Sequence, residues 1–293
     1  MDQITVKAYA KINLGLDVLG RLENGYHELR MIMQTVGIYD TLVLKKIPEE
    51  GKILLTTDRE DLPCDEKNLA YRAASLMFQK FALSGGIEIT LEKRIPMAAG
   101  MAGGSADAAA VLRGINVLYD CHADAEELKI LGKKLGADVP YCVVGGTCLA
   151  EGIGEKLTVL PKLPKAHLLI VKPDFDVSTK FVYEHLDAVP IANHPDIDAQ
   201  IAAVRAGDLK AVADCMGNVL QDVTVPSYPQ VGEIKEDMVK LGSFGAMMSG
   251  SGPSVFGFFE DEEKARVAFA EMQKKYPVAA IYVTGFVNPE EPA

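Results

Sequence analysis

Residues 93–109 read Lys-Arg-Ile-Pro-Met-Ala-Ala-Gly-Met-Ala-Gly-Gly-Ser-Ala-Asp-Ala-Ala. Small residues fill this stretch, so its backbone can approach a ligand closely. From Ser105 onward the sequence is helical in character, and a helix N-terminus offers unpaired N–H groups and a positive dipole end to an anion. Ser105 is placed to cap that helix or to offer a hydroxyl to a phosphate or a metal ion. The stretch indicates a phosphate-binding loop; the alternative is a tight turn that needs glycine for geometry alone.

This loop differs from the common nucleotide-binding motifs. It does not end in Gly-Lys-Ser/Thr, as a P-loop does, and the spacing from Gly100 to Gly103 is not that of a dinucleotide-binding fingerprint. The run from Asp174 to Asp176 is not the Asp-Phe-Gly of protein kinases. Lys93 and Arg94 open the stretch, and no acid follows them before Asp107.

Composition narrows the function classes. The chain has 293 residues, of which 48% are hydrophobic and 24% are charged, and its net charge is −11. That is the composition of a globular protein, and its acidity disfavours a nucleic-acid clamp or a surface that binds anionic membranes. Five cysteines without a Cys-x-x-Cys pair disfavour a disulfide framework or a zinc site. The start of the chain lacks the basic and apolar segments of a signal peptide, so we expect a cytoplasmic protein.

The periodicity predicts a mixed succession of elements. We expect strands over 11–18, 41–47, 52–57, 86–91, 141–150, 167–171, 244–248, 254–259 and 278–286, and helices over 68–82, 105–118, 124–136, 178–187, 196–206, 208–220, 228–241 and 261–275. Because the order is not a regular βαβ alternation, it predicts an α+β fold. Residues 161–164 (Pro-Lys-Leu-Pro) are the expected linker between two domains, 1–160 and 161–293.

Several polar residues are ambiguous when each is taken alone. Residues 11–18 alternate, with apolar side chains on one face and Lys11, Asn13 and Asp17 on the other, which predicts a half-buried strand. Taken alone, Lys11 fits a solvent-facing position better than a cleft. Taken alone, Asp138 fits an exposed loop acid or a helix cap better than a functional residue. Tyr183, taken alone, fits a core position. Only their co-occurrence with the loop indicates a site.

The loop and these polar residues together resemble the motifs of a known protein family. The order of Ala10-Lys11-Ile12-Asn13-Leu14, the loop at 96–109 and Met248-Ser249-Gly250-Ser251-Gly252-Pro253 is similar to that of the GHMP kinase superfamily of small-molecule kinases. Three further runs, at 25–27, 136–140 and 150–155, resemble the members that act in the non-mevalonate isoprenoid pathway on an alcohol carrying cytidine diphosphate. The resemblance covers nearly the whole chain. Met101, Ala102 and Ala106 stand where that family usually has Leu, Gly and Ser.

The resemblance implies a two-domain architecture. The N-terminal domain would be ribosomal-protein-S5-like and the C-terminal domain ferredoxin-like, with the active site in the cleft between them. The turn at Gly250, Ser251 and Gly252 would reach across from the second domain to support the phosphate loop.

The resemblance also implies a reaction and a set of site residues. The γ-phosphoryl group of ATP would pass to the 2-hydroxyl of a methylerythritol linked to cytidine diphosphate, with Lys11 and Asp138 catalytic and Mg²⁺ bound with help from Ser105. Substrate would contact Asn13, Tyr26, His27 and Tyr183. ATP would be bound by Asn68, Pro96, Met97, Ala98, Ala99, Gly100, Met101, Ala102, Gly103, Gly104, Ser105 and Ala106. No nucleic acid or membrane partner is implied, and the chain would be a monomer or a weak homodimer.

The role of Asp138 can be refined by general chemistry. A neighbouring lysine favours the ionised carboxylate and so disfavours a strong-base role. Phosphoryl transfer is largely dissociative, so positioning and charge stabilisation matter more than early proton removal. We therefore expect Asp138 to orient the hydroxyl and to take its proton late.

Two other functions stay open. One is a different GHMP kinase, for homoserine, mevalonate or a sugar, against which Tyr26, His27 and Tyr183 argue. The other is a non-catalytic nucleotide-binding or sensor protein on the same fold, which the presence of both Lys11 and Asp138 disfavours.

Overall fold

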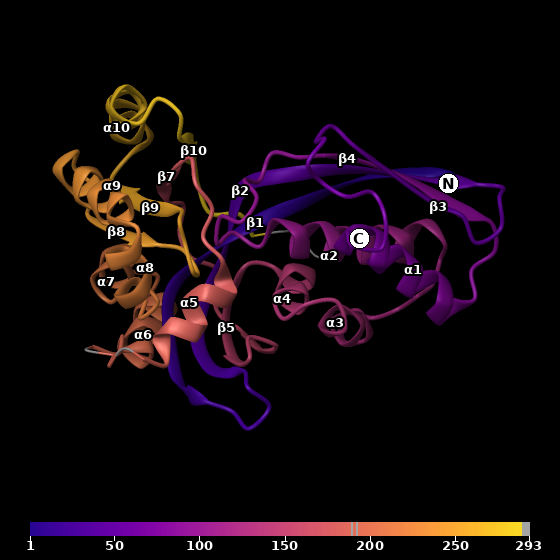
Figure 1. The fold of residues 1–293 in the computed structure, drawn as a ribbon, viewed down its shortest axis with the longest axis horizontal. Coiled ribbons are helices and arrows are strands. Elements are labelled where there is room, and N and C mark those ends of the chain that lie inside the picture. The colour runs from indigo at the N-terminus through magenta and orange to yellow at the C-terminus, as the bar shows by residue number, and fades with distance from the viewer. Residues whose placement is uncertain (189, 192, 289–293) are drawn as a thin grey trace.

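The computed structural model of the chain describes residues 1–188, 190–191 and 193–288. The six strands that precede residue 160 form one sheet and the four described strands that follow it form another, as Figure 1 shows. The first sheet contains β1 (Gln3–Arg21), β2 (His27–Ile47), β3 (Ile53–Thr57), β4 (Gly86–Glu92), β5 (Thr147–Gly152) and β6 (Lys156–Val159). The second contains β7 (His167–Lys172), β8 (Gly245–Met248), β9 (Val255–Phe259) and β10 (Ala280–Thr284). The mixture of helices and sheets confirms the α+β prediction.

The long strand β2 is the centre of the first sheet. It pairs antiparallel with β1 along most of its length, and on its other edge with β4 and then with β5. Register shifts interrupt the β1–β2 pairing on either side of Lys11 and Asn13. Helix α2 (Gly103–Leu118) packs on β1 and β2, and α1 (Leu69–Phe81), α3 (Ala125–Lys133) and α4 (Val139–Val144) pack around it. These helices cover one face of the sheet (Figure 1).

The second sheet has the antiparallel strand order β10-β7-β9-β8. Helices α9 (Pro229–Lys240) and α10 (Glu262–Lys275) pack on it. Between β7 and β8 the chain also forms α5 (Thr179–Leu186), α6 (Ile197–Ala206), α7 (Leu209–Asp214) and α8 (Gln221–Ser227). Along the chain, this part of the molecule has one strand, a group of helices, two strands, one helix and a last strand. This order is the expected ferredoxin-like arrangement. No helix within the described ranges is long and apolar enough to cross a membrane.

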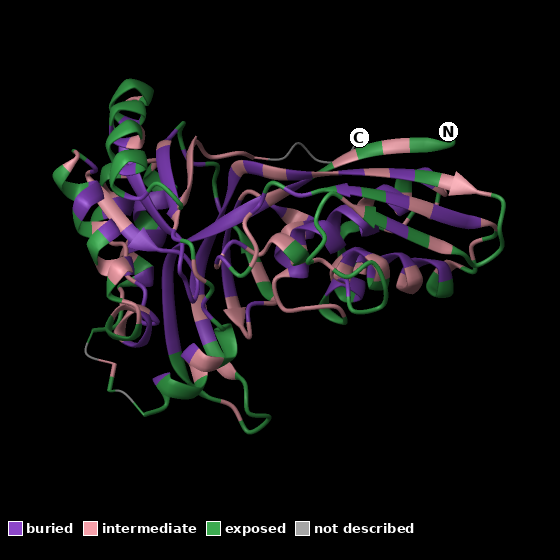
Figure 2. Ribbon diagram, turned by 45° about the horizontal axis from the view of Figure 1, so that its top comes forward, coloured by how far each residue is buried: buried purple, intermediate pink, exposed green. Residues whose placement is uncertain are grey.

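The prediction of a half-buried strand at 11–18 is wrong, because β1 is buried on both faces there (Figure 2). Segments from the second half of the chain cover the face that was expected to meet solvent. The amide N–H of Leu16 donates to the carbonyl of Gly217 at 2.8 Å, and the Gln200 side chain donates to the carbonyl of Leu14 at 2.7 Å. The chain's own second half therefore buries the polar face of β1, and that face becomes the floor of a cleft.

Two element assignments are also wrong. The predicted strand over 141–150 is the short helix α4 followed by β5, because Pro140 stands at the helix start, a position that proline suits. The predicted helix over 208–220 ends at Asp214, and a separate helix, α8, follows at 221–227. Strand β6 was not predicted.

Candidate functional site

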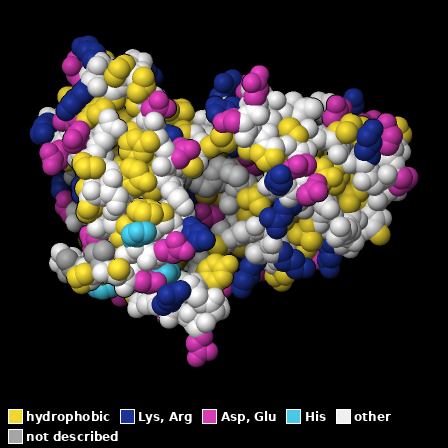
Figure 3. Space-filling model, viewed as in Figure 1, with side chains coloured by type: hydrophobic (Ala, Val, Ile, Leu, Met, Phe, Trp, Pro, Cys, Tyr) yellow, Lys and Arg dark blue, Asp and Glu magenta, His cyan; other side chains and the backbone are white. Residues whose placement is uncertain are grey.

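A cavity of about 870 Å³ lies between the two halves of the molecule. The space-filling view in Figure 3 shows the hollow that separates the two lobes. The predicted site residues that line it are Lys11, Asn13, Tyr26, His27, Asn68, Pro96, Met97, Ala98, Ala99, Gly100, Ala102, Gly103, Gly104, Ser105, Asp138, Tyr183, Gly250 and Ser251. Met101, Ala106 and Gly252 are buried beneath this lining.

The phosphate loop gets its shape from left-handed backbone at Ala98, Gly100 and Ala102, whose φ angles are 46°, 71° and 56°. Ala102 is the N-cap of α2, and the helix begins at Gly103 without a side-chain cap. Of the two roles expected for Ser105, the helix cap is therefore wrong: Ser105 is the third helical residue, and its side chain lines the cavity. The amide groups at the start of α2 are left without side-chain caps, which suits an anion site.

The glycine-rich turn of the second half lies directly against this loop. The Ser249 hydroxyl donates to the carbonyl of Gly100 at 3.0 Å. A Cβ added to Gly100 would lie only 2.1 Å from the backbone oxygen of Ser249, so glycine is required for this approach. The Asn218 side chain donates to the carbonyls of Met248 and Gly250 at 2.9 and 2.8 Å, which fixes the turn in place.

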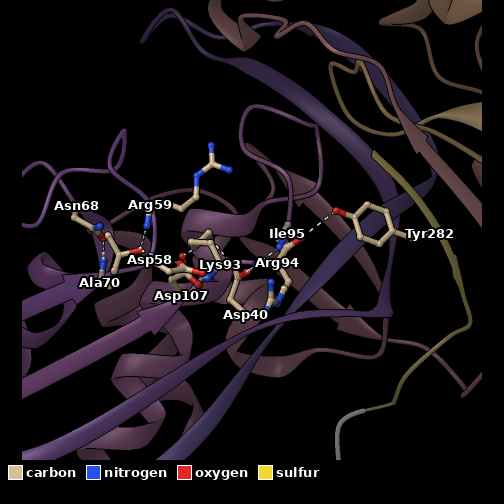
Figure 4. Close-up of polar contacts among 11 residues, drawn as sticks. Asp40, Asp58, Arg59, Asn68, Ala70, Lys93, Arg94, Ile95, Asp107 and Tyr282 are labelled. Atoms are coloured by element: carbon tan, nitrogen blue, oxygen red, sulfur yellow. Dashed lines mark hydrogen bonds and ion pairs between the residues drawn. The ribbon is translucent and has the colours of Figure 1, made fainter. Parts of the chain in front are cut away.

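A buried ion cluster ties the two ends of the loop together (Figure 4). The Lys93 ammonium bonds to Asp40, and it donates to Asp107 Oδ2 at 2.7 Å. Asp40 Oδ1 also accepts the amide N–H of Ile95 at 2.8 Å. Lys93 precedes the loop and Asp107 lies in α2 after it, so the cluster holds both ends against β2.

Carboxylates also balance the two cations at the start of the loop, Lys93 and Arg94. Burial lowers the pKa of Lys93, but the carboxylates of Asp107 and Asp40 outweigh burial and raise it above its ordinary value. Burial raises the pKa of Asp107 to about 7, because Lys93 is shared between two carboxylates. Lys93 is thus neutralised locally, and the Arg94 guanidinium pairs with Glu92 at the surface.

Lys11 is one of the cations that line the cavity at this end, together with Lys67 and Lys93. Its ammonium donates to Asn13 Oδ1 at 2.7 Å and to the carbonyl of Gly100 at 3.2 Å, and it lies 4.0 Å from Asp138 Oδ2. The Lys11 side chain is only 5% exposed, so the solvent-facing alternative for it is wrong. Asp138 stands at the start of α4 with its side chain 33% exposed. A lysine and a carboxylate therefore meet beside the phosphate loop.

Asn68 lies at the same end of the cavity. Its side-chain oxygen accepts the amide N–H of Ala70 at 2.9 Å and so caps α1, while its amide nitrogen donates to the carbonyl of Pro63 at 2.8 Å. These contacts hold the cap residue of α1 at the cavity wall, where Lys67 and Leu69 also line the space.

The opposite end of the cavity brings together the predicted substrate residues. The rings of His27 and Tyr183 lie 5.1 Å apart and are tilted by 31°. Burial raises the pKa of Tyr183 well above its ordinary range. Tyr26, beside them on the β1–β2 turn, is 60% exposed. Aromatic faces of this kind suit a stacked base.

Sequence reasoning missed two residues at this end. Asp187, the C-cap of α5, accepts a hydrogen bond from His27 Nε2 at 2.7 Å and pairs with Arg21 at 3.1 Å. Both line the cavity. The four-residue spacing of Tyr183 and Asp187 on a predicted helix was the available signal, because such residues share a helix face.

Comparisons with known proteins agree with this arrangement. Residues 68–146 match the family described as GHMP kinases N terminal domain, and residues 200–278 match GHMP kinases C terminal. A crystal structure of homoserine kinase from Cytophaga hutchinsonii, covering 100% of this chain and 97% of that one, has a TM-score of 0.78 at 23% identity, which concerns the fold alone. The chain belongs to the GHMP kinase family.

The greater likeness is to one kind of GHMP kinase. The 4-diphosphocytidyl-2-C-methyl-D-erythritol kinase of Lachnospira eligens is 53% identical over 289 residues, 99% of this chain and 100% of that protein. A crystal structure of 4-(cytidine 5'-diphospho)-2C-methyl-D-erythritol kinase has a TM-score of 0.83 at 33% identity, covering 98% of this chain and all of that one.

Proposed function

We propose that this protein transfers the γ-phosphoryl group of ATP to the 2-hydroxyl of 4-diphosphocytidyl-2-C-methyl-D-erythritol, a step in isoprenoid precursor synthesis. The observation that carries the proposal is the single cavity with two chemically different ends. One end offers loop amides, Lys11 and Asp138, and the other offers His27 and the Tyr183 ring. The full-length likeness to kinases of that name supports the same substrate.

The phosphate loop binds the ATP phosphates in this proposal. Backbone N–H groups and the α2 dipole stabilise charge that is already in place, so little reorganisation accompanies transfer. The Lys11 ammonium is held by Asn13 and by the Gly100 carbonyl, which fixes it beside the loop. At about 4 Å from a phosphate oxygen, one lysine contributes roughly 4 kcal/mol at an effective dielectric of 20. The acidic net charge of the chain is therefore compatible with binding two polyanions.

Asp138 orients the acceptor hydroxyl. Its carboxylate is partly exposed to the cavity and lies 4.0 Å from the Lys11 ammonium, which is too far for a hydrogen bond. A substrate hydroxyl can therefore donate to Asp138 without displacing the lysine. The hydroxyl proton then passes to Asp138 late in the transfer.

The residues present fit a magnesium ion. Mg²⁺ in kinases is held by one or two protein oxygens, by substrate phosphates and by waters. Ser105 lines the cavity, and a Cβ built on Gly136 would lie 3.8 Å from its hydroxyl, so Ser105 is close to the turn that carries Asp138. No group of three His, Cys, Asp or Glu side chains that could hold a metal ion occurs among the described residues. Ser105 would hold it, and it would neutralise phosphate charge during transfer.

The proposal also covers the cellular compartment, the oligomeric state and the domain boundaries. We propose that the chain works in the cytoplasm as a monomer or a weak homodimer, and that its domains divide at the linker into residues 1–160 and 161–293.

Two alternatives make different predictions. A GHMP kinase for homoserine, mevalonate or a sugar has no base to stack, so it has no use for Tyr26, His27 and Tyr183 at the far end of the cavity. A non-catalytic sensor has no need of Lys11 and Asp138 within 4.0 Å of each other.

A substrate panel tests the proposal. The protein is incubated with ATP, Mg²⁺ and, in turn, the cytidine diphosphate-linked methylerythritol, homoserine, mevalonate and galactose, and ADP release and phosphorylated product are measured. We expect product only with the first, carrying phosphate at position 2. Faster transfer to any of the others, or ATP turnover without phosphorylated product, overturns the proposal.

A further inference from the structure

The imidazole of His27 is held by a carboxylate from the other half of the chain. His27 is the first residue of β2, and Asp187 is the C-cap of α5. The 2.7 Å contact joins His27 Nε2 to Asp187 Oδ1. An ionised carboxylate can only accept, so Nε2 carries the proton. In a neutral imidazole the other nitrogen, Nδ1, is then unprotonated and can only accept a hydrogen bond.

Asp187 is itself fixed from a second side. Its Oδ2 lies 3.1 Å from the Arg21 guanidinium at the end of β1, and Arg21 pairs with His27 across the β1–β2 ladder. The hydrogen bond from His27, with the nearby charge of Arg21, holds the pKa of Asp187 below its usual range. The carboxylate thus stays ionised and bridges the β1–β2 hairpin to α5, one helical turn after Tyr183.

We propose that Asp187 is a positioning residue that fixes His27 as the Nε2–H tautomer, so that the pocket selects cytosine over uracil. The inference rests on the proposed function, because it assumes that the base lies at this end of the cavity. Asp187 acts through His27, whose Nε2 it holds.

The chemistry of the two bases gives the direction of the effect. Cytosine and uracil differ at C4, where cytosine carries an amine that donates and uracil a carbonyl that accepts. An unprotonated Nδ1 accepts from the amine and repels the carbonyl oxygen. Without Asp187, the imidazole is free to rotate and to present an N–H instead, which suits uracil. Sites that match hydrogen-bonding groups discriminate far better than sites that match shape alone.

The first test compares two substrates, the cytidine-linked methylerythritol and its analogue with uracil in place of cytosine. For Asp187→Ala we expect the ratio of their kcat/KM values to fall about tenfold, the worth of one hydrogen bond, through a higher KM for the cytidine substrate. The kcat value and the KM for ATP stay close to those of the wild type. The amide oxygen of Asp187→Asn still accepts from Nε2–H, so we expect its ratio to lie between that of the wild type and that of Asp187→Ala.

Asp198→Ala is the matched control. Asp198 also bridges α6 to the β1–β2 ribbon, through a two-pronged pair with Arg30 at 2.7 and 2.9 Å, and it lies outside the cavity lining. Loss of that bridge should leave the base ratio unchanged. An unchanged ratio in Asp187→Ala, or an equal fall in both control and test, overturns the inference.

Nitrogen-15 NMR of histidine-labelled protein tests the same inference without any turnover. We expect His27 as the Nε2–H tautomer in the wild type and as a mixture in Asp187→Ala. An Nδ1–H tautomer in the wild type overturns the inference even if the enzyme prefers cytidine. If the tautomer is as expected but the wild type does not phosphorylate the cytidine substrate, the proposed function fails and the selectivity role falls with it.

Discussion

The two ends of the cavity are built in opposite ways. The phosphate end is backbone held by buried contacts: left-handed turns, the Gly100–Ser249 approach and the Lys93 cluster. The base end consists of side chains that remain partly exposed and are held by a few polar contacts between the hairpin and α5. In the proposed function the first end binds the ATP phosphates, whose chemistry is common to all kinases. In the same proposal the second end recognises the base of one substrate, and its side chains can be replaced without disturbing the core.

The largest effect is expected for Asp138→Asn. The amide keeps the shape but cannot take the proton, so kcat should fall roughly 10³-fold, as for loss of a general acid–base group. Affinity for ATP and for the cytidine substrate should be retained, as measured by calorimetry. Asp120→Asn, at an exposed turn with φ of 52°, is the control. Near-normal turnover in Asp138→Asn would remove Asp138 from the mechanism.

The next largest effect is expected from the buried Lys93 ion cluster, which holds the phosphate end in place. Lys93→Met leaves Asp40 and Asp107 buried without their cation, which should lower the free energy of unfolding by about 3 kcal/mol. The lower end of the usual range applies because Asp40 keeps its backbone donors. Chemical denaturation measures the change. Lys210→Met, which breaks an exposed pair with Asp214, should cost less than about 1 kcal/mol, and equal losses in the two variants would contradict a structural role for the cluster.

At the base end, truncation should affect binding and leave the fold intact. Tyr183→Ala removes a stacking face worth about 1–3 kcal/mol per base, so KM for the cytidine substrate should rise by about 5- to 150-fold while KM for ATP is unchanged. Phe175→Ala is the control, because it loses a stacked partner, Tyr228, outside the cavity lining. Steady-state kinetics that show both KM values rising together would argue against separate ends.

The smallest effect tests the strain in the loop. Ala102 has a φ of 56°, a conformation that costs an alanine about 1–2 kcal/mol relative to glycine. Glycine loses part of that gain through the greater freedom of the unfolded chain, so Ala102→Gly should stabilise the protein by up to about 1 kcal/mol. Ala110→Gly, in the middle of α2, should destabilise it by about 1 kcal/mol. A destabilising Ala102→Gly would show that the left-handed turn is not strained.

The sequence predicted the structure of the phosphate end better than that of the base end. The small residues around Gly100 and the following helix are local signals, so the loop and the start of α2 could be predicted within a few residues. The pairing of Lys93 with Asp40 joins residues 53 positions apart, and a single sequence does not reveal it. Burial of the Lys11 face likewise depends on the packing of Gln200 and Gly217 against β1.

The errors in secondary structure have local causes. Residues 139–144 form a short apolar run, and such a run does not distinguish a strand from a buried helix. In the segment 208–220, Gly217 and the tight turn after Cys215 end a pattern that otherwise continues as a helix. Helix α8 contains Pro226 and β-branched residues, which disfavour a helix on propensity alone. The role of Asp187 was not predicted, because its partners, His27 and Arg21, are distant in sequence.

The most direct test of a two-ended site compares the cytidine diphosphate-linked methylerythritol with the cytidine-free sugar alcohol as phosphate acceptors. Both present the same hydroxyl to Asp138, but only the first can use the base end. If remote binding energy positions the hydroxyl, kcat/KM for the cytidine-free alcohol should be lower by at least about 10²-fold. Equal rates on the two acceptors would contradict the account, because the base end would then contribute nothing to the reaction.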